Sequence, residues 1–411
     1  MTLLFLAVVI AGGLIQLWLG ARQRAFVRAH RDQVPEAFQG AIVAVDHRNA
    51  ADYTVAKLAL GRWDIALSAA LLLAWTLGGG IDLLSSALAG FGLPPLLAGV
   101  GLLLGIGLIT DLLSLPLEAV ATFRVEAQFG FNRQTPALFI RDRVVGWLLM
   151  LVLGAPLAAG LIYLLERGGS LWWLWAWLLW SAFSLSLVWI YPRFIAPLFN
   201  RFEELPDDAL RTRLEALLER CGFTSRGLQV MDGSRRSNHG NAYFTGFGRN
   251  RRIVLFDTLI ESLDPAEIEA VLAHELGHYK LAHVKQRMAL SLGLSLLGFA
   301  VLGWLSAQPW FHLALGVSLP SPASTLALFA LAAPPFMLWM MPLAALWSRR
   351  HEYEADSFAS EYTDTNDLIS ALVKMFRENA TTLTPDPLYA RFYYSHPTAV
   401  DRIAALRALD G

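Results

Sequence analysis

The feature that most constrains this chain is a series of seven apolar stretches, each close to the roughly 20 residues that a helix needs to cross a bilayer. They run near Leu3 to Leu19, Trp63 to Leu88, Pro94 to Leu117, Val144 to Leu165, Leu171 to Ile190, Met288 to Leu305 and Thr325 to Trp347. Hydrophobic residues make up 55% of the chain and charged residues only 16%, which is too apolar for an ordinary soluble protein. The sequence therefore predicts a multi-span membrane protein.

Lys and Arg are unevenly distributed over the connections between these stretches. Seven lie in residues 22–62 and four in residues 124–143, whereas the connection near Gly90 has none. Cytoplasmic loops of membrane proteins are enriched in basic residues. We therefore expect the two basic loops, the segment 192–287 and the segment from 348 onward to face the cytoplasm. The first stretch has no basic residue before it, which favours an uncleaved anchor over a secretory signal.

Charge and cysteine content exclude two further classes of protein. The formal net charge is -1 and the basic residues stand in loops beside apolar stretches, so no nucleic-acid partner is expected. The single cysteine, Cys221, excludes a framework of internal disulfides and is expected to be a small packing residue.

A His-Glu-Leu-Gly-His motif has the spacing of a hydrolytic metal site. On a helix, His274 and His278 lie one turn apart on the same face and can bind one zinc ion. Glu275 can act as a general base toward a water at the metal. Asp264 and Glu267 fit the N-cap and capping box of this helix, which we expect to continue into the sixth apolar stretch.

Two histidines do not complete a zinc site, so another part of the chain has to supply a ligand. The best match follows the last apolar stretch, where Glu352 and Asp356 are four residues apart on one helical face. This spacing suits a metal-binding carboxylate and a second carboxylate that orients a histidine through its other ring nitrogen. His351 and Glu354 point elsewhere on that helix and are expected to be solvated or paired. His283 is expected at the membrane interface.

The segment before the motif predicts a small sheet. Leu228 to Met231 and Arg252 to Phe256 are short apolar runs with Asn241 to Thr245 between them, and we expect a hairpin that turns at Gly248 to Asn250. The strand from Asn241 could hold an extended peptide at the edge of this sheet.

Two acidic residues stand in or at the end of the third apolar stretch. Carboxylates are costly in lipid, so Asp111 and Glu118 are expected to face protein or water. They indicate a wet interior cavity only weakly, and an interfacial position for Glu118 fits equally well.

An ordered set of motifs resembles one family. Beside the metal motif, the set comprises Phe-Gly-Phe-Asn-Arg-Gln-Thr from Phe129, Pro-Leu-Phe-Asn from Pro197, Asn-Ala-Tyr-Phe from Asn241, Arg-Ile-Val-Leu-Phe-Asp-Thr from Arg252, Glu352 with Asp356, and Ser-His-Pro from Ser395. In this order they are similar to the type I CAAX prenyl proteases, integral-membrane zinc endopeptidases of the gluzincin group. The resemblance covers nearly the whole chain, including the seven-span layout.

The resemblance implies roles for the matching residues. It implies one zinc ion per chain, bound by His274, His278 and Glu352, with Glu275 as the catalytic base and Asp356 behind the metal ligands. It further implies contacts with the substrate or transition state from Asn241 and His396, supported by Arg402. The expected substrate-binding residues are accordingly Asn241, Ala242, Tyr243 and Phe244. From the residues alone, His396 before a proline would be an ordinary turn residue.

The expected fold class is a mainly α, multi-pass membrane protein. About seven transmembrane helices would enclose a chamber and carry a small α+β zinc metalloprotease domain. The expected division places five transmembrane helices in 1–195, the metalloprotease segment in 196–287, two transmembrane helices in 288–347, and a helical segment that completes the zinc site in 348–411.

The expected function is hydrolysis of peptide bonds by a metal-activated water, as in proteases acting near the C-terminus of prenylated proteins. A quality-control protease for membrane proteins without prenyl substrates, a membrane transporter and a catalytically silent zinc scaffold are the alternatives. The expected partners are a peptide or protein substrate, prenylated or not, and the lipid bilayer. The chain's short length and the absence of a lysine-rich carboxyl-terminal signal favour a bacterial inner membrane, with the active site facing the cytoplasm.

Overall fold

The computed structural model describes residues 1–206, 208–223, 227–245 and 252–409. In this part of the chain, seven helical segments are long and apolar enough to cross a membrane, and one small sheet is present. The segments comprise Thr2–Ala29, Ala44–Trp75, Pro95–Glu126, Pro136–Arg167, Gly169–Phe199, His283–Ser306 and Pro322–Tyr362. The predicted fold class, a mainly α multi-pass membrane protein with a small α+β part, is confirmed.

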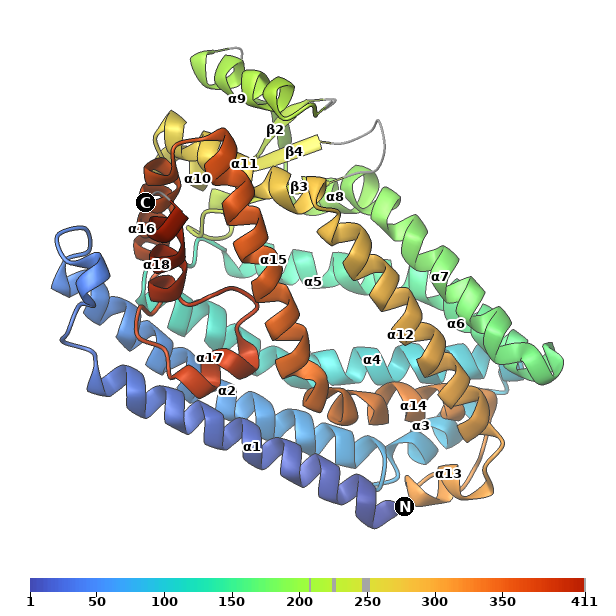
Figure 1. Cartoon of the computed structure of the whole chain (residues 1–411). Coiled ribbons are helices and arrows are strands. Elements are labelled where there is room, and N and C mark those ends of the chain that lie inside the picture. The colour runs from blue at the N-terminus through green and yellow to red at the C-terminus, as the bar shows by residue number, and fades with distance from the viewer. Residues whose placement is uncertain (207, 224–226, 246–251, 410–411) are drawn as a thin grey trace.

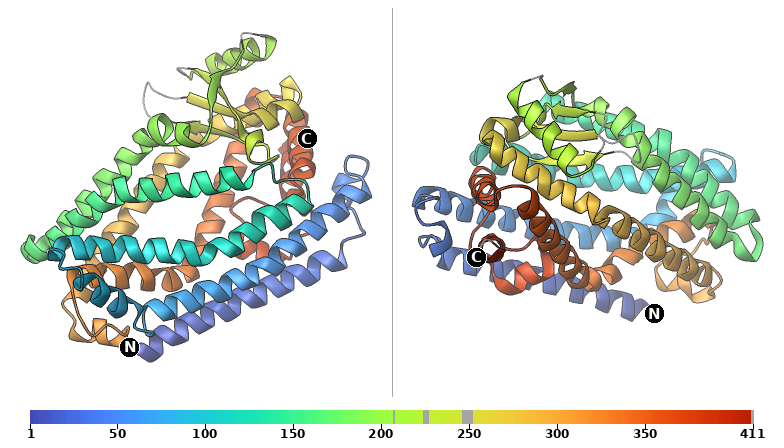
Figure 2. Two further views of the ribbon diagram at one scale, coloured as in Figure 1. Left: turned by 180° about the vertical axis from the view of Figure 1, so that it is seen from behind. Right: turned by 45° about the horizontal axis from the view of Figure 1, so that its top comes forward.

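The long helices surround the interior of the molecule. The sheet lies at one end, and the N-terminus, α3 and α13 lie at the other (Figures 1 and 2). The helices of the membrane part are α1 (Thr2–Ala29), α2 (Ala44–Trp75), α3 (Gly80–Ala89), α4 (Pro95–Val120), α5 (Pro136–Leu149), α6 (Ala155–Arg167), α7 (Trp172–Ile190), α12 (His283–Ser306), α13 (Pro309–Ala314), α14 (Pro322–Met337) and α15 (Met341–Tyr362). The remaining helices are α8 (Ala196–Phe199), α9 (Ala209–Arg220), α10 (Asp257–Ser262), α11 (Pro265–Lys280), α16 (Thr365–Glu378), α17 (Pro387–Tyr393) and α18 (Ala399–Leu409).

The second predicted span, Trp63 to Leu88, has the wrong bounds. Helix α2 ends at Trp75, and the next helix, α3, begins only at Gly80. Between them Gly79 has a φ of 74°, a left-handed conformation that glycine adopts without a steric penalty. The apolar run continues across this break, so hydropathy alone could not locate the end of the helix.

The sheet has the strand order β1-β2-β4-β3, formed by β1 (Phe202–Glu204), β2 (Leu228–Met231), β4 (Arg252–Phe256) and β3 (Ala242–Thr245). Strand β3 pairs antiparallel with β4, with Ala242 opposite Leu255. Strand β3 is therefore an edge strand, and the three predicted strand segments are confirmed. The expected turn at Gly248 to Asn250 lies outside the described residues.

The motif helix α11 begins as predicted but ends earlier. Asp264 and Glu267 form a reciprocal capping box, in which the Asp264 amide donates to Glu267 Oε2 at 2.8 Å. The expectation that α11 continues into the sixth span is wrong, because Ala282 has a φ of 60° and separates α11 from α12. This break turns His283 back toward the end of the motif helix.

Burial on several sides holds α11 in place. The apolar side chains Ile268, Leu272 and Leu276 are at most 1% exposed and belong to one core with residues of the sheet, α9, α16 and α18. Burial of one leucine contributes roughly 1.5–3 kcal/mol. Helix α11 also packs against α15, and this contact brings together the two helices that carry the predicted metal ligands.

Candidate metal centre

The three predicted metal ligands meet between α11 and α15. One nitrogen each of His274 and His278 and one oxygen of Glu352 lie within 4.8 Å of one another. The Nε2 atom of His274 is 3.5 Å from Glu352 Oε2, and the Nε2 atom of His278 is 3.3 Å from Glu352 Oε1. Both imidazoles therefore present the same ring nitrogen to one carboxylate.

The burial and bonding of Glu352 test whether a metal fits here. This residue is 2% exposed, and its Oε2 atom accepts no hydrogen bond within the described structure. A buried carboxylate oxygen without a donor is costly, and a bound cation would remove that cost. Two imidazole nitrogens and one carboxylate oxygen, with room for water, are the donor set of catalytic zinc sites, so the residues fit the metal.

His274 is oriented from behind by a buried ion pair. Its Nδ1 is 2.8 Å from Asp356 Oδ1, and Arg402 donates to the same carboxylate from Nε and Nη2 at 2.8 and 2.7 Å. Burial and the charge of Arg402 lower the pKa of His274, but the neighbouring carboxylates of Asp356 and Glu352 outweigh them and raise it to about 9. The predicted position of Asp356 behind a histidine matches this geometry.

His278 has an equivalent support that the sequence did not predict. Its Nδ1 is 3.0 Å from His283 Nδ1, and His283 Nε2 is 2.9 Å from Glu354 Oε2. His283 is 1% exposed, so its expected interfacial position is wrong. Glu354 is paired, as expected, with His283 and with Arg350. The chain reversal at Ala282 brings His283 to this position, and spacing along one continuous helix could not reveal it.

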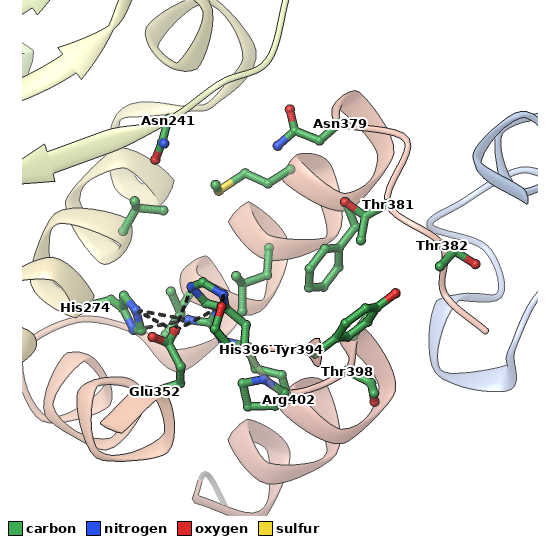
Figure 3. A pocket seen from close by; sticks show the side chains of 18 of the residues that line it. Asn241, His274, Glu352, Asn379, Thr381, Thr382, Tyr394, His396, Thr398 and Arg402 are labelled. Carbon is green, nitrogen blue, oxygen red and sulfur yellow. Dashed lines mark hydrogen bonds and ion pairs between the residues drawn. The ribbon is translucent and has the colours of Figure 1, made fainter. Parts of the chain in front are cut away.

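A cavity of about 420 Å³ opens beside this group and is lined by Glu275, Asn241 and His396 (Figure 3). Burial raises the pKa of Glu275, which makes its carboxylate a better proton acceptor. His396 Nε2 lies 3.4 Å from Glu352 Oε2. Partial desolvation by neighbouring groups lowers the pKa of His396 against the pull of Glu352.

The edge strand places only some of its predicted residues at this cavity. Asn241, directly before β3, lines it, whereas the described lining does not include Ala242, Tyr243 or Phe244. Ala242 is buried in the core, and Phe244 packs edge-on against Phe223 with ring centroids 5.5 Å apart. A peptide in this cavity could therefore pair with the backbone of β3, and not with these three side chains.

The two acidic residues of the third span have partners inside the protein. Arg143 pairs with Asp111 at 3.0 Å and also with Glu118. Asp111 additionally accepts from the Trp147 indole at 2.8 Å. Both carboxylates therefore contact protein, as expected for charged groups at membrane depth.

Seven spans and a His-Glu-x-x-His helix completed by a glutamate from a second helix define a membrane-embedded metallopeptidase of the gluzincin arrangement. Comparison with family models matches residues 23–201 to the N-terminal five membrane helices of CAAX prenyl protease and residues 204–410 to peptidase family M48. The chain belongs to this family. It is thus a membrane metalloprotease with a metal cofactor that acts on peptide or protein substrates.

Individual relatives support the same assignment. The CAAX prenyl protease 1 homolog of Arabidopsis thaliana is 40% identical over 304 residues, which cover 74% of this chain and 70% of that protein. The homolog of Oryza sativa subsp. japonica is 38% identical, over 75% of this chain and 73% of that protein. The crystal structure of S. mikatae Ste24p superposes with a TM-score of 0.91 at 28% identity and covers 98% of each chain. These relatives are eukaryotic and lend no support to the expected bacterial origin.

Proposed function

We propose that this protein is a zinc endopeptidase, with one zinc ion bound by His274, His278 and Glu352, that cleaves near the C-terminus of prenylated proteins. The observation that carries the proposal is the convergence of these ligands beside Glu275 in a cavity next to an edge strand. The relatives are CAAX prenyl protease 1 homologs, which supports this substrate class.

The chain's own residues supply most of the chemistry of hydrolysis. When bound, the zinc ion would polarise the scissile carbonyl and acidify the attacking water. Glu275 takes the proton from that water and delivers it to the leaving amine nitrogen, a role suited to a carboxylate whose pKa is raised. Asp356 and Arg402 keep the His274 ring in one orientation through the cycle.

The other lining residues bind and orient the peptide. The His396 imidazole donates a hydrogen bond to the substrate carbonyl oxygen as negative charge develops on it. The β3 edge adds the peptide as a further strand, so Ala242, Tyr243 and Phe244 contribute backbone hydrogen bonds and Asn241 a side-chain contact. Backbone recognition of this kind accepts many side chains around the cleaved bond.

Zinc analysis combined with a peptide-cleavage assay tests this proposal. Wild type should contain one zinc per chain and cleave a prenylated peptide, and Glu275→Gln should keep the metal but lose cleavage. An active, metal-loaded Glu275→Gln enzyme contradicts the assignment of the base. Comparing prenylated with unprenylated peptides separates a CAAX protease from a general quality-control protease.

We also propose that the metal centre faces the cytoplasm. The basic loop before α2 lies at the same end of the molecule as the metalloprotease part, because the short helix Glu36–Phe38 in this loop contacts α18. The division of the chain also remains a proposal. It places five transmembrane helices in 1–195, the metalloprotease segment in 196–287, two transmembrane helices in 288–347 and a helical segment in 348–411. No observation on the described residues favours the transporter or the silent scaffold over hydrolysis.

A further inference from the structure

A second cavity, of about 620 Å³, adjoins the one at the metal centre. The two cavities share five lining residues, namely Asn379, Thr381, Thr382, Tyr393 and Tyr394. Figure 3 shows Thr381, Thr382 and Tyr394 on the side of the metal centre that faces the blue N-terminal helices. An extended peptide that leaves the metal centre along this shared wall would enter the second cavity.

The second cavity carries only positive charge. Arg24 of α1 and Lys57 and Arg62 of α2 line it, and no Asp or Glu does so among the described residues. None of these three cations takes part in an ion pair within the described structure, although other basic residues of the same loop do, such as Arg31 with Asp52. The cavity is thus equipped for an anion that the chain itself does not supply.

Lys57 illustrates this arrangement. Its ammonium lies over the Tyr53 ring, 3.9 Å from the centroid. The carboxylate that attracts it, Glu126, accepts a hydrogen bond from the Tyr53 hydroxyl at 2.6 Å and does not line the cavity. An anion in the cavity would therefore meet a lysine held by an aromatic face and not neutralised by a direct carboxylate contact.

We propose that this cavity binds the free carboxylate at the C-terminal end of the peptide substrate. The inference rests on the proposed function, because a protease acting near a C-terminus has that carboxylate a few residues beyond the cleaved bond. Charge-assisted contacts in a sheltered cavity favour a carboxylate over a neutral amide. The cavity would then set the distance between the cleavage site and the end of the chain.

Two peptides that differ only in a free or amidated C-terminus test this proposal. Wild type should cleave the carboxylate form with a kcat/KM about tenfold higher, mainly through KM. Lys57→Met and Arg62→Gln should bring this ratio toward one. Arg28→Gln, on the exposed side of α1, is the matched control and should keep the wild-type ratio.

Each outcome of this experiment is decisive. Equal cleavage of both peptides by wild type overturns the proposal, as does a wild-type ratio in the Lys57 and Arg62 variants. If those variants instead change how activity depends on anionic lipid in reconstituted vesicles, the cavity binds a lipid headgroup and the proposal is wrong. Cleavage of neither peptide by wild type would contradict the proposed function itself.

A different set of contacts carries a second proposal. His278 points Nε2 toward Glu352 and places Nδ1 3.0 Å from His283 Nδ1. With zinc bound at its Nε2, the neutral His278 imidazole carries its proton on Nδ1 and donates it to His283 Nδ1. His283 must then be protonated on Nε2, which donates to Glu354 Oε2. Arg350 Nε holds the other oxygen of Glu354 at 2.9 Å. With zinc bound at His278 Nε2, every donor in this series therefore has an acceptor.

We infer that His283 is a positioning residue for the zinc ligand His278. His283, His351 and Glu354 also form a group that could hold a cation. However, both ring nitrogens of His283 are already engaged, and its ring stacks on His351 at 3.9 Å with an interplanar angle of 5°. These contacts therefore favour a role for His283 as the hydrogen-bond partner of His278 over a role as a ligand of a second metal ion.

Two substitutions of His283 distinguish positioning from packing. The amide oxygen of His283→Asn can take the place of Nδ1 and accept from His278, whereas the amide of His283→Gln takes the place of Nε2. Zinc affinity, measured by competition with a chromogenic chelator, should stay near wild type in His283→Asn and fall about tenfold or more in His283→Gln. Equal affinities in the two variants, or wild-type affinity in His283→Ala, would overturn the inference.

Discussion

Arg402 and Asp356 form the support of His274, and both side chains are almost fully buried. Asp356→Asn would keep the size of the side chain but remove the carboxylate charge that pairs with Arg402 at 2.7 Å. We expect zinc affinity to fall 10- to 100-fold, because the ring of His274 loses its partner. We also expect a loss of about 3–5 kcal/mol in stability, the usual cost of breaking a buried ion pair.

Chelator competition and thermal unfolding in detergent measure these two effects. Glu361→Gln is the matched control, since Glu361 is an exposed carboxylate on the same helix. The assignment fails if Asp356→Asn binds zinc as tightly as this control.

Asp386 gives a pH dependence to the contact between α1 and α17. It accepts from the amides of Leu388 and Tyr389 at 3.1 and 3.0 Å and pairs with Arg22 at 2.9 Å. Burial raises the pKa of Asp386, but these donors outweigh it and hold the pKa below its ordinary value. A lowered carboxyl pKa stabilises the fold above the unfolded pKa of about 3.9 and loses that effect as pH falls through the folded pKa.

Asp386→Asn should therefore lower the free energy of unfolding by about 1 kcal/mol near neutral pH. The effect is small because Arg22 is partly exposed and its charge is screened. The difference from wild type should shrink as pH falls below about 4. Unfolding midpoints of both proteins across this range provide the measurement. A difference that does not change with pH would show that the charge of Asp386 contributes nothing.

At the scale of elements, the distance between α11 and α15 decides whether a metal site exists. A Cβ atom at Gly277 would lie 3.0 Å from Ala355 Cα and 3.1 Å from its carbonyl oxygen. These are backbone atoms, so α15 would have to move and carry Glu352 away from the histidines. The glycine of the motif thus has a packing reason that the motif pattern alone does not state.

Gly277→Ala should lower stability by about 1–3 kcal/mol and weaken zinc binding together with kcat. Gly293→Ala on α12 is the control, because no atom lies within 4 Å of the added Cβ there. This control should be neutral or slightly stabilising, since alanine favours helix. A Gly277→Ala enzyme that matches the control in stability and activity would contradict the role of this close approach.

At the scale of the whole molecule, the orientation in the membrane decides which substrates reach the site. In a Cys221→Ser background, Phe91→Cys and Leu319→Cys should react with a membrane-impermeant maleimide added outside intact cells. Gln39→Cys, in the basic loop, should react only after the membrane is opened. All three positions are exposed in the structure, so access by the reagent depends on sidedness. The reverse pattern would place the metal centre on the other side.

Local sequence signals were sufficient for much of this architecture. Apolar stretches predict the spans because lipid admits few polar groups, and Asp264 with Glu267 predicts the start of α11 because the capping box is formed within four residues. The turn between α2 and α3 was missed because Gly78, Gly79 and Gly80 interrupt the helix without ending the apolar stretch.

The sequence by itself determined the membrane class of this protein and the ligand spacing of His274 and His278, because both follow from short-range periodicity. Only the tertiary structure decided what surrounds those ligands. The chain reversal at Ala282 brings His283 to His278. The close approach of the helices at Gly277 brings Glu352 to both histidines. The packing of α1 and α2 beside residues 379–394 creates the second, positively charged cavity. Such contacts join residues far apart in the chain, so no local pattern encodes them.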